Sequence, residues 1–167
     1  MAGLRKRARS IRLAIFDVDG VLTDGTVWMG PAGEAIKAFN ILDGHGIKMI
    51  QQAGVATAIL AGRKSRAVSL RAKELGIGDV IQGSTDKLAD FASLAAKHGV
   101  TPEECAFVGD DLPDLPVMDR VGLAVAVANA VEPVKKRAHY ITRASGGHGA
   151  VREFCDMLVA ARSKDGE

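Results

Sequence analysis

The stretch that most limits how this chain can fold is an apolar run, Ile11–Phe16, which ends abruptly in Asp-Val-Asp-Gly at residues 17–20. Alternate residues of a half-buried strand share a face, so Asp17 and Asp19 would converge where that strand ends. Two carboxylates held this close repel each other and lose hydration, and a divalent cation is the simplest compensation. A polar turn of Asp and Gly is the plainer alternative. The apolar run before the pair and the Thr-Asp-Gly sequence at residues 23–25 favour a cation site.

Short apolar runs alternate with helical patterns along the rest of the chain. The runs that predict strands are Ile11–Phe16, Ala56–Leu60, Asp79–Ile81, Cys105–Val108, Leu123–Val127 and Tyr140–Ile141. Helical spacing occurs between Asp86 and His98, and a last helix is expected over Ala150–Arg162. Strands buried on both faces and joined through helices predict an α/β fold, a doubly wound parallel sheet. Two further segments, Thr26–Met29 and Ile36–Phe39, flank a Gly-Pro-Ala-Gly turn and predict a β-hairpin flap.

The length of 167 residues suits one domain with a sizeable core. We expect a basic N-terminal extension over residues 1–10, a single domain over residues 11–162 and a C-terminal tail over residues 163–167. The first twelve residues carry five of the 22 basic side chains and none of the 20 acidic ones. Such a segment could bind nucleic acid or lipid, but no aromatic or further basic cluster continues it. We therefore interpret it as a solvated extension and expect no nucleic-acid partner.

Neither membrane insertion nor a disulfide framework is expected. No apolar run approaches ~18 residues, which is about the length needed to span a bilayer. The two cysteines, Cys105 and Cys155, are too few for a disulfide framework and lack the spacing of metal ligands. Both lie among apolar neighbours, so we predict buried thiols in a reducing cytoplasm.

Polar motifs follow the first, second and fourth predicted strands, and ligands in such sheets bind beyond the carboxyl ends of the strands. These motifs begin with Asp17, with Gly62-Arg63 and with Gly109-Asp110-Asp111. Oxygen ligands from Asp17, Asp19 and Asp110, completed by water, would suit Mg²⁺. The histidines and cysteines form no tetrahedral cluster, which argues against zinc. The shared position of the motifs predicts one site.

Lys87 follows the third predicted strand. It is either a surface lysine on a helix or a cation that offsets the charge of a nucleophile and contacts a phosphoryl group.

The segment over residues 17–25 resembles the first signature of the haloacid dehalogenase (HAD) superfamily of phosphohydrolases. The resemblance covers residues 11–158, and the Thr-Asp-Gly extension is similar to the small members that lack a large cap domain. It is strongest to phosphatases of 3-deoxy-D-manno-octulosonate 8-phosphate (KDO 8-phosphate), which serve lipopolysaccharide precursor synthesis. It implies that Asp17 is the nucleophile, which forms an aspartyl-phosphate, and that Asp19 is the acid–base residue and binds Mg²⁺ through its backbone carbonyl. It also implies that Lys87 contacts the phosphoryl group and that Asp111 and Asp114 hold the site from behind.

One position departs from the pattern of the resembled family. Its second motif has Thr or Ser directly before Gly62-Arg63, and the hydroxyl donates to the phosphoryl group. This chain has Ala61. We expect the missing donor to affect the rate more than the reaction class. A non-catalytic, HAD-like oligomerisation module is the alternative that Ala61 leaves open, and a phosphatase for a nine-carbon, sialic-acid-type 9-phosphate is the other.

The resemblance also implies a set of substrate contacts. These are Asp19, Asn40, Ile41, Leu42, Asp43, Gly44, Lys48, Arg63, Arg71 and Lys87. Arg63 and Arg71 lie eight residues apart on or before one predicted helix, so they could share a face, and arginine suits a carboxylate or phosphate. An anionic sugar-acid phosphate is therefore the expected substrate.

The intervals from Asp19 to Arg63 and from Arg63 to Lys87 are too short for a cap domain. By resemblance, we expect a homotetramer in which neighbouring subunits roof each other's active sites. The segment around Gly146-Gly147 resembles one that reaches a neighbouring site, and a flexible turn before a helix is its alternative.

Overall fold

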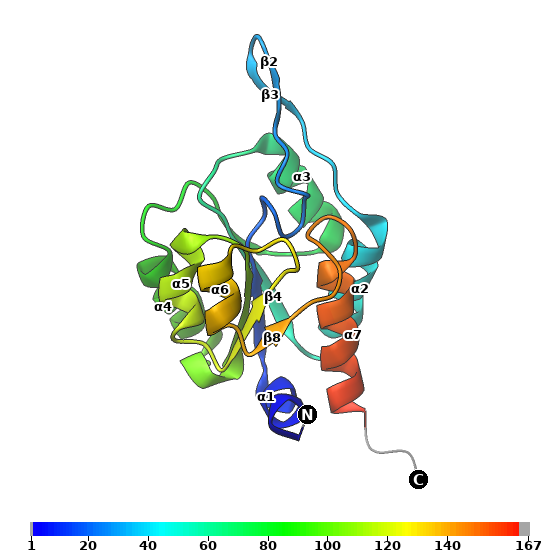
Figure 1. The fold of residues 1–167 in the computed structure, drawn as a ribbon, viewed down its shortest axis with the longest axis vertical. Coiled ribbons are helices and arrows are strands. Elements are labelled where there is room, and N and C mark those ends of the chain that lie inside the picture. The colour runs from blue at the N-terminus through cyan, green and yellow to red at the C-terminus, as the bar shows by residue number, and fades with distance from the viewer. Residues whose placement is uncertain (1, 164–167) are drawn as a thin grey trace.

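The computed structural model describes residues 2–163, and within them a six-stranded sheet forms the centre of the molecule (Figure 1). The strands run in the order β5-β4-β1-β6-β7-β8, and every neighbouring pair is parallel. Their bounds are β1 Leu13–Phe16, β4 Ala56–Leu60, β5 Asp79–Ile81, β6 Cys105–Gly109, β7 Leu123–Ala126 and β8 Tyr140–Ile141. The chain builds outward from β1 to β4 and β5, and then returns to the other side of β1 at β6. This reversal leaves a crevice between the carboxyl ends of β1 and β6.

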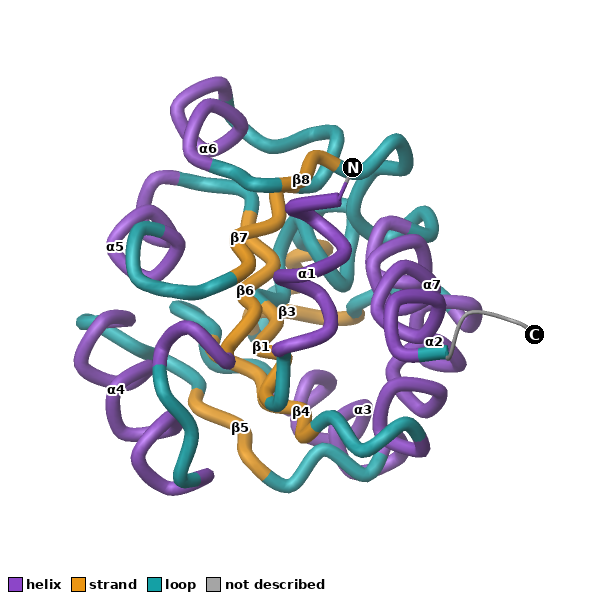
Figure 2. The backbone as a smooth tube through the Cα atoms, turned by 90° about the horizontal axis from the view of Figure 1, so that it is seen from below, coloured by secondary structure: helices purple, strands orange, loops and turns teal. Residues whose placement is uncertain are grey.

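Helices cover both faces of the sheet, as Figure 2 shows along the strand direction. Helices α4, α5 and α6 lie on one face, and α2, α3 and α7 lie on the other. The helices in the described part of the chain are α1 Ala2–Ser10, α2 Ile41–Gln52, α3 Arg66–Leu75, α4 Lys87–His98, α5 Leu115–Met118, α6 Glu132–Arg137 and α7 Ala150–Arg162. This three-layer arrangement confirms the predicted doubly wound α/β fold.

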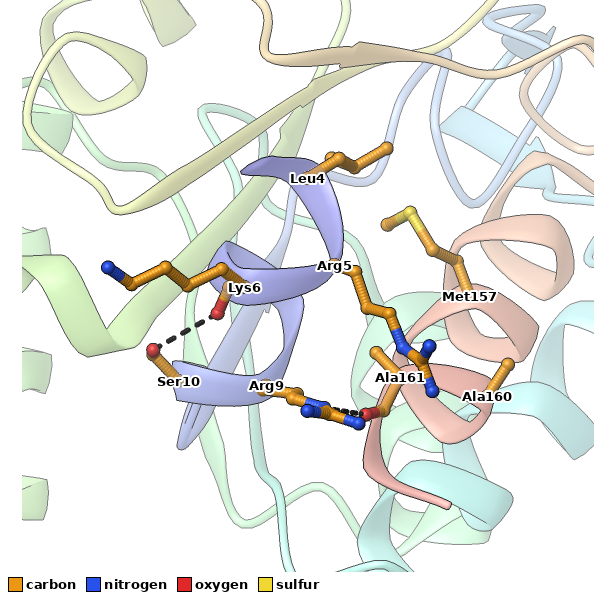
Figure 3. A pocket seen from close by; sticks show the side chains of 8 residues that line it. All are labelled: Leu4, Arg5, Lys6, Arg9, Ser10, Met157, Ala160 and Ala161. Atoms are coloured by element: carbon orange, nitrogen blue, oxygen red, sulfur yellow. Dashed lines mark hydrogen bonds between the residues drawn. The ribbon is translucent and has the colours of Figure 1, made fainter. Parts of the chain in front are cut away.

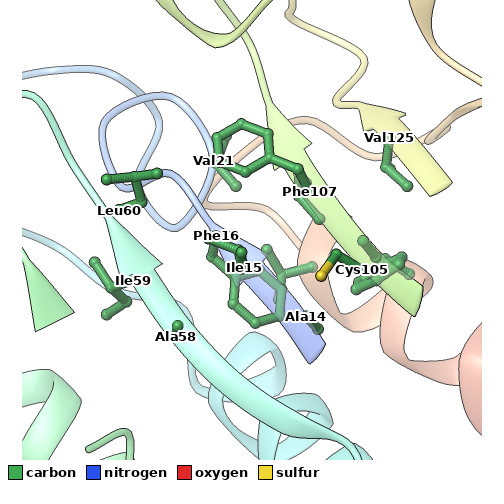
Figure 4. Close-up of a cluster of buried hydrophobic side chains, with 14 of the residues drawn as sticks. Ala14, Ile15, Phe16, Val21, Ala58, Ile59, Leu60, Cys105, Phe107 and Val125 are labelled. Carbon is green, nitrogen blue, oxygen red and sulfur yellow. The ribbon is translucent and has the colours of Figure 1, made fainter. Parts of the chain in front are cut away.

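The core explains why the central strands read as continuous apolar runs. Every residue of β1, β6 and β7 is buried, because helices pack on both faces of these strands. Figure 4 shows the side chains of β1, β4 and β6 packed against one another. The ring of Phe16 meets that of Phe154 on α7 edge to face, with centroids 6.0 Å apart. All six predicted strands are present, with their ends shifted by at most two residues.

The basic segment at the N-terminus differs from the prediction. Residues 2–10 form α1, which packs against α7 at the end of the molecule opposite the hairpin (Figures 1 and 3). Ala8 is fully buried, and the Nε of Arg9 donates to the carbonyl of Ala161 at 2.7 Å. Arg7 donates to the carbonyl of Gly122 at 2.7 Å. Residues 2–10 therefore form a helix docked on the main body by two of its arginines, although its four basic residues remain exposed. Met1 and residues 164–167 of the expected tail lie outside the described residues.

The flap is an antiparallel hairpin of β2, Trp28–Gly30, and β3, Gly33–Ile36. It projects from the body of the protein (Figure 1), with strands that begin and end closer to the turn than expected. Trp28, Met29 and Ile36 are exposed on it. No helix in the described part of the chain is both long and apolar enough to cross a membrane.

Candidate active site

The motifs that follow the first and fourth predicted strands meet in the crevice at the carboxyl ends of β1 and β6. Phe16 pairs with Val108 in the sheet, and the next residue, Asp17, donates its backbone amide to the carbonyl of Val108 at 3.1 Å. Asp110 follows β6 directly. The parallel register therefore brings Asp17 and Asp110 side by side, although they lie 93 positions apart in the sequence.

The loop after β1 is a compact turn that Thr23 holds together. The buried hydroxyl of Thr23 accepts from the amides of Gly20 and Gly25, each at 3.2 Å. Gly20 has a φ of 85°, and a Cβ there would collide with a carboxylate oxygen of Asp110. Only glycine allows this loop to approach Asp110 so closely. The Asp-Gly-x-x-Thr-Asp-Gly pattern is thus needed for the backbone conformation of this loop as well as for its carboxylates.

Lys87 is buried at the start of α4 and joins two carboxylates. Its Nζ lies 3.1 Å from Oδ1 of Asp17 and 2.7 Å from Oδ1 of Asp114. Burial alone would lower the pKa of Lys87, but the two carboxylates outweigh it and raise that pKa above its ordinary value. The structure therefore excludes a surface lysine, because the Lys87 side chain is buried against Asp17 and Asp114.

Asp114 holds the back of the site. Its Oδ2 accepts from the backbone amides of Asp110 at 2.9 Å and Asp111 at 3.2 Å, while its Oδ1 accepts from Lys87. Both oxygens are therefore already satisfied by the protein. This matches the supporting position expected for Asp114, while the side chain of Asp111 accepts from the amide of Leu112.

Asp17 and Asp110 are left with the capacity to bind a cation. Burial, and then the neighbouring carboxylate of Asp114, raise the pKa of Asp17 to about 6. Burial and the charges of Asp17 and Asp114 raise the pKa of Asp110 to about 8. Oδ1 of Asp110 is buried without a hydrogen-bond partner. Oxygens of Asp17, Asp110 and Asp114 all lie within 4.8 Å of one another. With Asp114 already occupied by the protein, the oxygens of Asp17 and Asp110 fit a hard divalent cation such as Mg²⁺, which would relieve the repulsion.

Asp19 belongs to a second, outer group of charges that the flap contributes. Lys37 places Nζ 2.5 Å from Oδ1 of Asp19 and 3.2 Å from Oε2 of Glu34. Arg63 lies 3.9 Å from Oδ2 of Asp19 through Nε and 3.6 Å from Glu34 through Nη2. The hydroxyl of Ser65 donates to Glu34. The four charged groups thus form a ring of alternating sign that ties the flap to the loop after β4.

A small open cavity of about 170 Å³ joins the two groups. Its lining includes every residue that was predicted to be catalytic or to bind the metal, namely Asp17, Asp19, Lys87 and Asp110. The other residues that line it are Gly62, Arg63, Asp111, Pro113 and Asp114. The volume suits a phosphoryl group rather than a whole sugar phosphate, so the rest of a substrate would lie across the outer ring.

The expected substrate contacts at the start of α2 are not gathered in this cavity. Asn40 caps the helix, with its side chain accepting from the amides of Leu42 and Asp43. The Asp43 carboxylate is buried and accepts from the amide of Arg152 on α7. Its Oδ1 therefore has a structural partner, whereas Oδ2 is buried without a hydrogen-bond partner, and a substrate contact of Asp43 stays a prediction. Ile41, Leu42 and Lys48 are exposed.

Arg71 and Arg63 do not share a helix face, because Arg63 precedes the first residue of α3 by three positions. Arg71 donates to the backbone carbonyl of Asn40 at 3.2 Å and pairs with Glu74 at 2.8 Å. A Cβ on Gly44 would collide with its guanidinium. Arg71 thus packs against the start of α2, where Gly44 leaves room for its guanidinium.

The segment around Gly146 packs on the loop that follows β1 in the same chain. The amide of Gly146 donates to Oδ1 of Asn129 at 2.6 Å, and Nδ2 of Asn129 donates to the carbonyl of Gly20 at 3.1 Å. Gly147 donates to the carbonyl of Val21 at 3.1 Å. A Cβ on Gly146 would overlap the carbonyl of Gly20. In this chain the segment therefore supports its own site and is not a free turn.

Comparison with known proteins agrees with this geometry. A family model described as haloacid dehalogenase-like hydrolase matches residues 69–154. The Escherichia coli (strain K12) 3-deoxy-D-manno-octulosonate 8-phosphate phosphatase KdsC is 50% identical over 158 residues, which cover 95% of this chain and 84% of that protein. The chain belongs to the haloacid dehalogenase-like hydrolases.

Solved structures of HAD-like hydrolases share the whole fold. A probable YrbI family phosphatase from Pseudomonas syringae is 52% identical with a TM-score of 0.95, covering 98% of this chain and 93% of that one. The KDO 8-phosphate phosphatase of Moraxella catarrhalis, in complex with magnesium ion, phosphate ion and KDO, is 41% identical with a TM-score of 0.94. The match covers 97% of this chain and 93% of that one.

Three residues of the site were missed from the sequence. Glu34 and Lys37 were overlooked because they lie in the flap, and a charged pair three residues apart in a hairpin is an ordinary surface pattern. Asn129 reads as a turn residue before a helix. In the structure it bridges Gly20 and Gly146. The only available signal was that Glu34 and Lys37 are charges in a segment whose other side chains are largely apolar.

Proposed function

We propose that this protein is a Mg²⁺-dependent phosphatase that hydrolyses KDO 8-phosphate to KDO and inorganic phosphate, a step in lipopolysaccharide precursor synthesis. One observation carries the proposal: the buried Asp17–Lys87 pair lies beside Asp110, whose Oδ1 has no partner. This arrangement is suited to phosphoryl transfer to a carboxylate. The likeness to KdsC proteins over nearly the whole chain supports the substrate.

The first step transfers the phosphoryl group to the protein. An oxygen of Asp17 attacks phosphorus, and the bond from phosphorus to the sugar oxygen breaks with its electron pair on that oxygen. The carboxyl group of Asp19 gives its proton to the departing oxygen, which leaves as the sugar hydroxyl. Lys87 lies against the attacking carboxylate and offsets the negative charge that accumulates there.

The second step releases phosphate. Asp19, now a carboxylate, removes a proton from water as the water oxygen attacks phosphorus. The bond between phosphorus and Asp17 breaks, and the carboxylate is regenerated. Asp17 and Asp110, with the backbone carbonyl of Asp19, would hold Mg²⁺, which when bound neutralises the phosphate and lets an anionic carboxylate approach it.

The outer part of the site would recognise the sugar acid. Arg63 is half-exposed at the mouth of the cavity and offers a guanidinium to a carboxylate. We include Lys48, Arg71 and the start of α2 in the proposed substrate surface. They lie outside the lining of the cavity, so they would contact the sugar part of the substrate and not its phosphate group.

We infer that the protein is a homotetramer whose subunits roof one another's sites. Support comes from exposed apolar side chains on the flap, Trp28, Met29 and Ile36, and at the start of α2, Ile41 and Leu42. Exposed apolar groups of this size mark protein contacts. Light scattering should give four times 17.5 kDa. A fully active monomer would contradict this assembly.

We also place the enzyme in the cytoplasm. Both cysteines are buried free thiols, which is compatible with a reducing compartment. Cell fractionation followed by immunodetection checks the assignment, and recovery in an oxidising or membrane fraction would contradict it.

Phosphate release from a panel of sugar phosphates tests the function directly. With Mg²⁺, KDO 8-phosphate should have the highest kcat/KM, and EDTA should abolish turnover until Mg²⁺ is restored. A preference for a nine-carbon 9-phosphate would change the assigned substrate but leave the proposed reaction mechanism in place. No turnover of any phosphate monoester, by folded protein in Mg²⁺, would favour the non-catalytic module that Ala61 leaves open.

A further inference from the structure

Lys37 is buried in an unusual way for a residue of a projecting flap. It follows β3 directly, and its side chain is only 1% exposed. Lysine is almost never buried this completely unless it is paired. Its Nζ lies 2.5 Å from Oδ1 of Asp19, which is shorter than its distance of 3.2 Å to Glu34. The flap therefore delivers one desolvated ammonium group to one oxygen of the acid–base carboxylate.

We propose that Lys37 is a positioning residue for the reaction and acts through Asp19. By occupying Oδ1, it fixes the rotation of the carboxyl group and leaves Oδ2 as the oxygen that exchanges the proton. This inference rests on the proposed phosphatase function, because it assigns Lys37 to the acid–base residue of that mechanism.

The contacts of Asp19 support this division between its two oxygens. Oδ2 has a weak contact with Arg63 at 3.9 Å, and the Arg63 side chain is 51% exposed. Because water screens such an exposed ion pair, Arg63 can fix the orientation of the Asp19 carboxylate only weakly. Without Lys37 the Asp19 side chain would keep no close partner among the described residues. A third group that orients an acid–base residue is a recurrent feature of catalytic sites.

The orientation matters in the step that breaks the bond from phosphorus to the leaving oxygen. That oxygen takes the proton from Oδ2 of Asp19 as it receives the electron pair of the broken bond. A poor leaving group depends on the proton, whereas a good one can depart as an anion. Loss of Lys37 should therefore harm poor leaving groups selectively. A residue that only anchors the flap would affect all substrates alike.

The experiment compares two sugar-free substrates, phenyl phosphate and 4-nitrophenyl phosphate, in the full-length enzyme with Mg²⁺. The measured quantity is kcat/KM, which covers the reaction up to the first phosphoryl transfer. General acid catalysis typically contributes 10²–10⁴-fold, so we expect Lys37→Met to lower kcat/KM for phenyl phosphate about tenfold more than for 4-nitrophenyl phosphate. Lys37→Arg keeps a cation at Asp19 and should return the ratio most of the way to that of the wild type.

Two matched variants separate this role from flap anchoring and from general loss of charge. Glu34→Gln weakens the ties of the flap to Arg63 and Ser65 but leaves Lys37 on Asp19, so it should keep the wild-type ratio even where rates fall. Lys73→Met removes an exposed lysine of α3 and should change neither substrate.

Three results would overturn the proposal. The first is an equal loss on both aryl substrates in Lys37→Met. The second is a raised KM for KDO 8-phosphate with an unchanged aryl ratio, which would make Lys37 a substrate contact. The third is the same altered ratio in Glu34→Gln. Wild-type activity on the aryl phosphates but not on KDO 8-phosphate would refute the proposed substrate while leaving the Lys37 test intact. A wild-type enzyme inactive on every phosphate would refute both proposals.

Discussion

The two halves of the site come from different kinds of structural element. The inner set, Asp17, Lys87, Asp110 and Asp114, lies at or just beyond the ends of β1, β5 and β6, at the edge of a buried sheet. The outer set, Asp19, Glu34, Lys37 and Arg63, comes from loops and a projecting flap. In the inner set, burial raises the pKa of two carboxylates. In the outer set, the hydrogen bond from Ser65 lowers the pKa of Glu34, aided by Lys37 and Arg63.

This difference teaches how one fold separates chemistry from recognition. Removing one member of a buried ion pair leaves an uncompensated charge, so inner substitutions should be severe. An exposed ion pair contributes little, so outer substitutions should be mild unless they touch substrate or a reacting group. Lys37 should be the exception: it belongs to the outer set, but its side chain is as buried as those of the inner set. Its substitution should therefore be severe.

The largest expected effect is on the inner nucleophile. Asp17→Asn should lower kcat by at least about a thousandfold, because an amide oxygen is a poor nucleophile. The aspartyl-phosphate should also disappear from acid-quenched enzyme. Asp156→Asn, an exposed change on α7, serves as the matched control. Retention of more than about a tenth of the wild-type rate, in a folded variant, would remove Asp17 from the role of nucleophile.

A smaller effect is expected at the outer arginine. Arg63→Met should raise KM for KDO 8-phosphate on the order of tenfold, since a charge-assisted contact is worth roughly 1.5–3 kcal/mol. It should leave kcat/KM for 4-nitrophenyl phosphate nearly unchanged, because that substrate lacks the sugar carboxylate. An equal fall on both substrates would place Arg63 in the chemistry and would break the comparison between the two sets.

The inner carboxylates also predict how stability varies with pH in the absence of metal. The pKa of Asp110 is raised from 3.8 to about 8, so the folded protein holds a proton that the unfolded chain has released between those values. The free energy of unfolding should therefore fall as pH rises through that window. Asp110→Asn removes this loss. Relative to wild type, it should gain on the order of 1–2 kcal/mol between pH 5 and pH 8, after allowance for partial solvent screening.

Urea unfolding in EDTA at the two pH values measures this gain. Asp119→Asn is the control, because that exposed residue pairs with Arg137 at the surface, away from the inner carboxylates. The variant should also lose the stabilisation that Mg²⁺ gives to the wild type. A pH-independent difference between Asp110→Asn and wild type would show that the carboxylates do not share a desolvated site.

The same division decides how much of the molecule was predictable from its sequence. Each central strand is a continuous apolar run because it is buried on both faces, so the sheet and the motifs that follow its strands could be read locally. Asp17, Lys87 and Asp110 were found in this way. The parallel register then brings their side chains together, because the carboxyl ends of neighbouring parallel strands lie at the same edge of the sheet.

The outer set could not be read in this way. Whether Lys37 points to solvent or to Asp19 depends on how the flap folds back, which is a contact over 18 residues without a pattern of its own. The expected shared helix face of Arg63 and Arg71 was wrong for a similar reason. Spacing suggested a shared face with Arg63, but α3 begins only at Arg66 and Arg71 packs against the start of α2. The docking of α1 on the main body was not expected, because arginines that bind backbone carbonyls look the same in sequence as arginines that contact only water.

The smallest predicted effect concerns Ala61, which stands at the end of β4 where the family pattern has a hydroxyl. Ala61 is buried, and its backbone is fixed by bonds to Ile81 at 2.8 Å and Ser84 at 3.0 Å. A lost donor to a developing oxyanion can cost on the order of 10²–10³ in rate, but Lys87 and nearby backbone amides remain. Ala61→Thr should therefore raise kcat only several-fold, with a smaller change in KM, because the contact strengthens as charge builds in the transition state.

Ala61→Val is the matched control, since it has nearly the same shape without the hydroxyl. Steady-state kinetics and melting temperatures of the two variants decide the matter. If Thr and Val behave alike, or if kcat stays at the wild-type value in a Thr variant of unchanged stability, another donor already serves the phosphoryl group and the inner set is complete without Ala61.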